Sequence, residues 1–161
     1  MGVDQQLLES LAQWRDSKAV ILGIGNTLKG DDATGPLVCE RLSGRVSARV
    51  IDASAVPENH IGPVLEASPD VLLIVDAVDF GGHPGQIRVC TPDEIHRFTF
   101  STHALSLHLS IDLIRRERKV EVYVVGVQAG RTKLGDCLSP AVREAIGTLA
   151  DTLTQLFRPN P

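Results

Sequence analysis

Short apolar runs alternate along the chain with segments in which apolar residues recur every three or four positions. The apolar runs predict strands at 19–24, 48–51, 71–75, 86–90 and 120–127. The periodic segments predict helices at about 34–42, 61–67 and 105–116, and a last helix that begins at Ser139-Pro140. This order indicates two βαβ units, whose right-handed crossovers make the strands parallel.

The strand at 86–90 requires a different connection. A parallel neighbour needs a crossover of about a dozen residues, and the segment that follows the strand at 71–75 is too short to provide one. We therefore expect residues 86–90 to form an antiparallel edge strand. The sequence predicts a three-layer α/β/α sandwich around a mostly parallel five-stranded sheet. Residues 1–161 are expected to form one domain, with residues 1–17 as an N-terminal helical extension.

Composition narrows the possible partners and compartments. The net charge is −4 and no run of Lys or Arg is present, so the chain lacks the basic surface typical of nucleic-acid binding. No apolar run approaches the roughly 18 residues that a membrane helix requires. Three widely separated cysteines, Cys39, Cys90 and Cys137, are interpreted as reduced, small hydrophobic residues of a cytoplasmic protein. We expect a monomer with neither a membrane nor a nucleic-acid partner.

Acidic residues follow two of the predicted strands. Asp31 and Asp32 come after the first strand, and Asp76 comes directly after the strand at 71–75. Ligands of open α/β sheets bind at the carboxyl ends of the strands, so these carboxylates should reach one crevice. His103 stands in a Ser-Thr-His turn before a helix. Two carboxylates and an imidazole could together form a small metal site with open coordination positions.

Each of these residues also has a simpler interpretation. Either Asp31 or Asp32 could cap the following helix while the other faces the crevice. Asp76 could form an Asx turn, and Asp79 could serve the turn that follows. His103 could bind the backbone at its helix start.

Other site chemistries fit the sequence poorly. Gly23 and Gly25 resemble the start of a dinucleotide-binding fingerprint, but Leu28 occupies the position of its third glycine. Asp31 and Asp32 would also face the negatively charged pyrophosphate at the helix N-terminus. No G-x-S-x-G elbow is present, and no cysteine stands next to a candidate base. The sequence therefore gives no support for covalent catalysis.

Four motifs in order closely resemble those of the nickel–iron hydrogenase maturation endopeptidases. They are Gly-Ile-Gly-Asn-Thr-Leu-Lys-Gly-Asp-Asp-Ala-Thr-Gly-Pro at 23–36, Pro-Glu-Asn at 57–59, Val-Asp-Ala-Val-Asp-Phe-Gly-Gly-His-Pro-Gly-Gln-Ile at 75–87, and Ser-Thr-His at 101–103. The similarity extends from about residue 21 to the final helix. The Pro-Glu-Asn and Asp-Asp motifs most resemble the branch that serves hydrogenase 3, the formate-hydrogenlyase type.

The resemblance implies an activity and a set of site residues. Members of this family remove a C-terminal extension from the hydrogenase large-subunit precursor after nickel insertion. By motif, the nickel-contacting residues fall on Asp32, Asp76 and His103, with Asp32 and Asp76 as the catalytic carboxylates of an aspartic or metal-dependent endopeptidase. The nickel belongs to the substrate, although zinc or cadmium could also occupy the site.

Two alternative functions remain open at this point. A nickel chaperone would use the same three residues without cleavage. A peptidyl-tRNA hydrolase also begins with a strand and Gly-x-Gly-Asn, but its further motifs are missing here.

Overall fold

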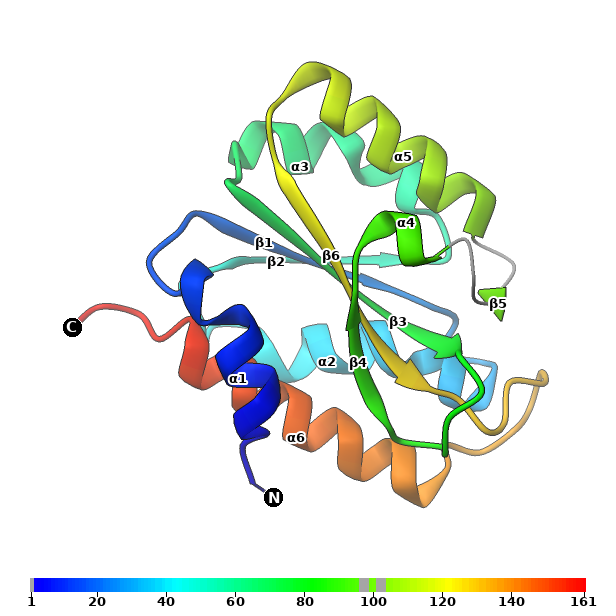
Figure 1. Cartoon of the computed structure of the whole chain (residues 1–161). Helices are drawn as coiled ribbons and strands as arrows, with labels where there is room; N and C mark the ends of the chain where they lie inside the picture. The colour runs from blue at the N-terminus through cyan, green and yellow to red at the C-terminus, as the bar shows by residue number, and fades with distance from the viewer. Residues whose placement is uncertain (1, 96–98, 101–103) are drawn as a thin grey trace.

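A mixed sheet with the strand order β2-β1-β3-β6-β4 lies at the centre of the molecule (Figure 1). The protein is seen in a computed structural model that describes residues 2–95, 99–100 and 104–161. β1, β2, β3 and β6 are parallel, whereas β4 is antiparallel to β6 at the edge. The strands are β1 (Ala19–Ile24), β2 (Arg49–Ser54), β3 (Val71–Asp79), β4 (Ile87–Cys90), β5 (Thr99–Phe100) and β6 (Glu121–Gln128).

Helices cover both faces of the sheet (Figure 1). One face is packed by α1 (Gln5–Leu11), α2 (Thr34–Leu42) and α6 (Pro140–Leu156), and the other by α3 (Ile61–Ala67) and α5 (Ala104–Glu117). Short elements connect them: η1 (Ala12–Trp14), η2 (Gly30–Ala33), η3 (Pro57–His60) and α4 (Pro92–Ile95). The predicted three-layer α/β/α sandwich with an antiparallel edge strand is confirmed.

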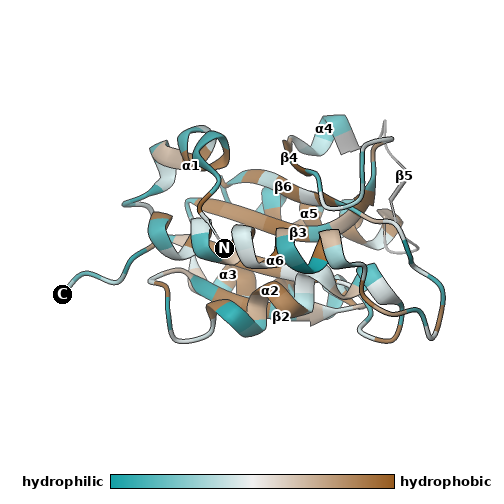
Figure 2. Ribbon diagram, turned by 90° about the horizontal axis from the view of Figure 1, so that it is seen from below, coloured by the Kyte–Doolittle hydropathy of each residue, from teal (hydrophilic) through white to brown (hydrophobic). Residues whose placement is uncertain are grey.

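Side chains on the two faces of each central strand belong to two separate hydrophobic cores. In β3, Leu73 and Val75 join the core under α2 and α6, whereas Leu72 and Ile74 join the core under α3 and α5. Both sides of the strand are buried, and Figure 2 shows hydrophobic residues along β3 between the helices. This is the pattern expected of a parallel strand that is covered on both faces. No helix in the described part of the chain is long and apolar enough to span a bilayer.

The structure corrects the sequence prediction at β3. β3 does not end before Asp76 but continues to Asp79, because β6 pairs with it as far as Val78 and the two-residue β5 pairs with its last two residues. Asp76 therefore lies within a strand. At the N-terminus, α1 buries three leucines in the core shared with α6, Leu7, Leu8 and Leu11.

Gly35 allows α2 to start directly on the backbone of two strands. A Cβ at this position would overlap the main-chain N and O of Ile24 and would lie 2.7 Å from the carbonyl oxygen of Val75. Only a residue without a side chain permits this approach. The close contact sets the distance between the first turn of α2 and the carboxyl ends of β1 and β3.

Replacing Gly35 with Ala should lower the free energy of unfolding by about 3 kcal/mol, since the obstructing atoms are backbone and cannot rotate away. Gly62→Ala is the matched control, because a Cβ there meets nothing within 4 Å and the residue lies in α3. That control should be neutral or stabilising by up to about 1 kcal/mol. Urea unfolding of both variants tests this, and equal stabilities would contradict the packing argument.

Candidate active site at the carboxyl edge of the sheet

Asp76 is a buried carboxylate that lacks a hydrogen-bond partner in the part of the chain that the structure describes. It is 1% exposed, and neither carboxylate oxygen has a partner among the described residues. Asp76 follows Ile74 by two residues and Leu72 by four, so its side chain is on the same face of β3, the face covered by α3 and α5. The Asx-turn interpretation is therefore wrong. A buried carboxylate left unpaired costs free energy that a hydrogen bond or a cation would offset.

Asp32 lies close to Asp76 on a separate element. It belongs to η2, the 3-10 turn between β1 and α2, and it is 4% exposed. One of its oxygens, Oδ2, accepts a hydrogen bond from the backbone N–H of Asn26 at 3.1 Å. α2 has no side-chain cap, so the prediction that one of the two aspartates caps this helix is wrong.

The charge of Asp32 affects the ionisation of Asp76. Burial and then the charge of Asp32 raise the pKa of Asp76 well above its usual 3.8. The nearby backbone N–H of Ala77 opposes this shift and lowers the pKa by a smaller amount. A buried acidic group beside a second carboxylate is chemically suited to share a cation with it.

His103 lies outside the described residues, so its predicted place beside the aspartates stays a prediction. The nearest described residues on either side of it are Phe100, which pairs with Val78 in β3, and Ala104, the first residue of α5. Among the described residues, no group of three or more His, Cys, Asp and Glu side chains could hold a metal ion. Of the three residues predicted to hold a metal, Asp32 and Asp76 are thus the two that the structure describes.

Asp31 has a structural role that the sequence did not reveal. Its carboxylate accepts four hydrogen bonds, from the N–H groups of Gly130, Arg131 and Ser139 and from the hydroxyl of Ser139, all at 2.7–2.8 Å. Burial would raise the pKa of Asp31, but these hydrogen bonds outweigh that effect and lower it below 3.8. Ser139 stands at the N-cap of α6, yet its hydroxyl binds Asp31 and makes no cap hydrogen bond.

Gln128 at the end of β6 holds the turn after β3. Its Oε1 accepts hydrogen bonds from the N–H groups of Phe80 at 2.9 Å and Gly82 at 3.1 Å, and its Nε2 donates to Asp79 at 3.2 Å. Asp79 also accepts a hydrogen bond from Gly81, which confirms its predicted role in the turn. A glutamine at the end of a strand was the only sequence signal for these hydrogen bonds.

The Pro-Glu-Asn motif forms η3 after β2, at the same edge of the sheet. Pro57 is buried, whereas Glu58 and Asn59 are exposed.

The interpretation of the cysteines as small hydrophobic residues holds for Cys39 and Cys90, which are buried, but is wrong for Cys137, which is exposed. Burial and then the charge of Asp52 raise the pKa of the Cys39 thiol to about 12.

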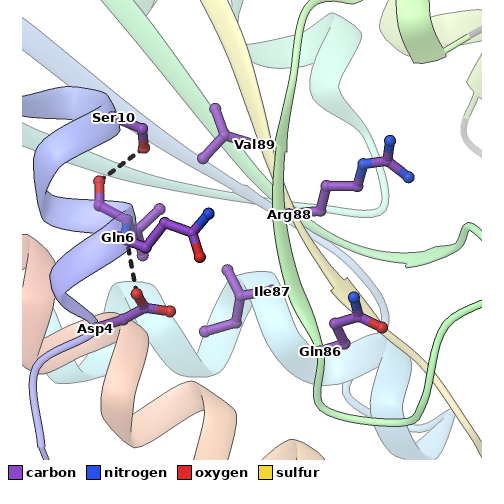
Figure 3. A pocket seen from close by; sticks show the side chains of 8 residues that line it. Asp4, Gln6, Ser10, Gln86, Ile87, Arg88 and Val89 are labelled. Atoms are coloured by element: carbon purple, nitrogen blue, oxygen red, sulfur yellow. Dashed lines mark hydrogen bonds between the residues drawn. The ribbon is translucent and has the colours of Figure 1, made fainter.

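A groove of about 370 Å³ lies between α1 and β4 (Figure 3). Its acidic residue, Asp4, caps α1 by accepting a hydrogen bond from Leu7 at 2.9 Å. Ser10 donates to the carbonyl of Leu7, and Ile87 and Val89 of β4 form an apolar wall. No second acid and no imidazole lines this groove, so it lacks the chemistry of the Asp32 and Asp76 site.

Comparison with solved structures defines the class to which this fold and site belong. The structure of the nickel–iron hydrogenase maturation protease HycI from Thermococcus kodakarensis KOD1 superposes with a TM-score of 0.80, at 31% identity, over 91% of this chain and 97% of the other. The solution structure of the endopeptidase HycI from Escherichia coli gives a TM-score of 0.75 at 31% identity, over 86% and 90% of the two chains. The fold is that of a maturation peptidase.

Sequence comparison identifies the family. The family model for hydrogenase maturation protease, HycI, matches residues 36–156. The hydrogenase 3 maturation protease of Escherichia coli K12 is 35% identical over 137 residues, which cover 83% of this chain and 87% of the relative. This chain belongs to the hydrogenase maturation protease family, and the predicted resemblance is confirmed.

Replacing Asp31 with Asn should lower the free energy of unfolding at pH 7 by about 3 kcal/mol, because an amide NH₂ would face groups that donate hydrogen bonds. Since folding lowers the pKa of Asp31, its contribution is complete above the ordinary value of 3.8 and is lost as the pH falls through the lower folded value.

Urea unfolding between pH 7 and pH 3 measures this effect. The stability gap between wild type and Asp31→Asn should narrow as the carboxyl group protonates. Asp112→Asn, at an exposed position of α5, is the control and should change stability by less than about 0.5 kcal/mol. An Asp31→Asn protein as stable as this control would refute the structural role.

Proposed function

We propose that this protein is an endopeptidase that removes the C-terminal extension of a nickel–iron hydrogenase large-subunit precursor after nickel has been inserted. Membership of the hydrogenase maturation protease family supports the peptidase activity. The similarity to the hydrogenase 3 maturation protease of Escherichia coli favours a precursor of the hydrogenase 3 type as the substrate. The same family assignment argues against the peptidyl-tRNA hydrolase alternative.

The observation that carries the proposal is the unpartnered carboxylate of Asp76. A strand residue that is 1% exposed and has two oxygens without a described partner is costly to keep unless a ligand completes it. The nearby carboxylate of Asp32 increases that cost, because its charge disfavours ionisation of Asp76. A divalent cation would offset the burial of both groups at once.

In this proposal Asp32, Asp76 and His103 contact the nickel that the precursor carries. Three protein ligands leave coordination positions open for groups of the substrate. The bound metal can polarise a carbonyl group or activate water, which is the chemistry that peptide hydrolysis requires. Asp32 and Asp76 orient this centre from two different elements, η2 and β3, and we assign the catalytic role to them.

In this proposal the nickel is part of the substrate and is not a resident cofactor. A precursor without nickel would then lack the group that the two carboxylates recognise. A nickel chaperone that does not cleave would use the same residues, so turnover separates the two functions. We further propose that the protein acts in the cytoplasm as a monomer.

Asp76→Asn and His103→Ala should each reduce cleavage of a nickel-loaded precursor by at least about a hundredfold, because each removes one metal ligand. Asp79→Asn is the control: it lies three residues further along β3, serves the turn, and should leave cleavage intact. The loss of C-terminal mass from the precursor is the measurement. Binding of nickel-loaded precursor without any mass loss in the wild type would favour the chaperone.

Stability measurements on Asp76→Asn test whether unfolding could explain a loss of cleavage. Folding raises the pKa of Asp76, so ionising it destabilises the wild type as the pH rises from 3.8 through the raised value. The variant escapes this cost and should be at least as stable as the wild type at pH 7, with the difference growing as the pH increases. A folded variant that still trims the precursor would refute the role of Asp76.

The purified protein should contain little metal, since three ligands form an incomplete coordination shell and the nickel arrives with the substrate. Elemental analysis after dialysis against a chelator measures this. One equivalent of metal retained per protein would instead indicate a resident metal centre.

A further inference from the structure

Two exposed leucines lie next to the candidate site, on loops that a hydrogen bond joins. Leu28 is 66% exposed and Leu134 is 73% exposed. Leu28 belongs to the loop between β1 and η2, and Leu134 to the loop between β6 and α6. The two loops are joined where the N–H of Gly135 donates to the carbonyl of Leu28 at 2.9 Å. We call this pair of loops, residues 26–31 and 129–139, the two-loop rim.

The backbone of the two-loop rim is held by many hydrogen bonds. Asp31 binds it through its carboxylate, and the N–H of Asp31 donates to the carbonyl of Arg131 at 2.7 Å. Gly30 has a φ of 52°, and a Cβ there would lie 2.6 Å from the same carbonyl. Asn26 accepts from Leu28, and Asp136 accepts from Lys133, each at 2.9 Å. The leucines are therefore displayed on a preorganised backbone, which reduces the entropy lost when a partner binds.

The position and charge of the rim indicate what it contacts. Asp31 directly precedes Asp32, so the rim borders the candidate site. Lys29, Arg131 and Lys133 lie in the same two loops, the last two fully on the surface, whereas the whole chain carries a net charge of −4. Asp136 is the partly exposed acid of this region, and cations exceed it on the surface. Exposed apolar side chains beside positive charges suit a partner segment that combines apolar and acidic residues.

We propose that the two-loop rim docks an apolar and acidic segment of the large-subunit precursor and positions it for cleavage. This inference rests on the proposed function. Leu28 and Leu134 would be covered by apolar side chains of the precursor, while Arg131 and Lys133 would attract its acidic groups.

A second copy of this chain fits the rim less well. The two leucines expose on the order of 250 Å², whereas a stable dimer buries about 800 Å² on each partner. A two-fold interface would also bring the cations of one rim towards those of the other, and such like-charge contacts are unfavourable. A transient enzyme–substrate contact requires neither a larger area nor symmetry.

Cleavage kinetics on nickel-loaded precursor test the proposal. Leu28→Ser and Leu134→Ser should each raise KM about tenfold and leave kcat unchanged, because the contact contributes equally to the ground state and the transition state. Arg131→Glu should also raise KM, and the salt dependence of KM should be weaker than in the wild type. All of these side chains are exposed, so the variants should melt at the wild-type temperature.

Leu113→Ser is the matched control, since Leu113 is 47% exposed on α5, more than two turns beyond the start of that helix. It should leave KM unchanged. An unchanged KM in the Leu28 and Leu134 variants would overturn the proposal, as would an equal rise in the Leu113 variant. Sedimentation that shows a wild-type dimer, dissociated by Leu134→Ser, would assign the rim to self-association instead. If the wild type fails to cleave the precursor at all, the proposed function itself is wrong.

Discussion

The carboxylate of Asp31 is the interaction on which the arrangement of the carboxyl edge depends. It joins the first strand-to-helix turn to the loop after β6 and to the start of α6, segments about one hundred positions apart in the chain. Four hydrogen bonds to one carboxylate therefore connect segments that are far apart in the sequence. Because Asp32 is the next residue, the same contacts fix where the second carboxylate can lie.

Asp31 and Asp76 show how the surroundings decide what a buried aspartate does. Both are almost inaccessible to solvent, at 0% and 1% exposure. Four donors surround Asp31, so its charged form is stable and its pKa is lowered. Asp76 has no described hydrogen-bond partner and faces the charge of Asp32, so its pKa is raised. The first arrangement stabilises the fold, and the second leaves coordination capacity for a ligand.

The architecture followed from the hydrophobic pattern because strands buried on both faces and amphipathic helices have distinct periods. Helix 34–42 and helix 61–67 coincide with α2 and α3. The hydrophobic pattern did not predict the length of β3. A strand that continues through an aspartate is recognisable only when its pairing with β6 and β5 is known.

The candidate site was predictable in the same uneven way. Asp32 and Asp76 were chosen because acids follow apolar strands, and in the structure the charge of Asp32 raises the pKa of Asp76. The division of roles between Asp31 and Asp32 depends on partners at 130–139, which no local pattern around residue 31 could indicate. His103 was chosen from its turn and its motif, and it lies outside the described residues.

The thiol of Cys137 gives this protein an intrinsic position for a spectroscopic label. Cys39 and Cys90 are buried, and burial raises the pKa of both thiols, so few of them are present as the reactive thiolate. Cys137 is exposed in the loop that also carries Leu134 and ends at Ser139. A maleimide dye would therefore attach mainly there without any mutation. Its fluorescence would report on solvent exclusion at this edge while the enzyme works.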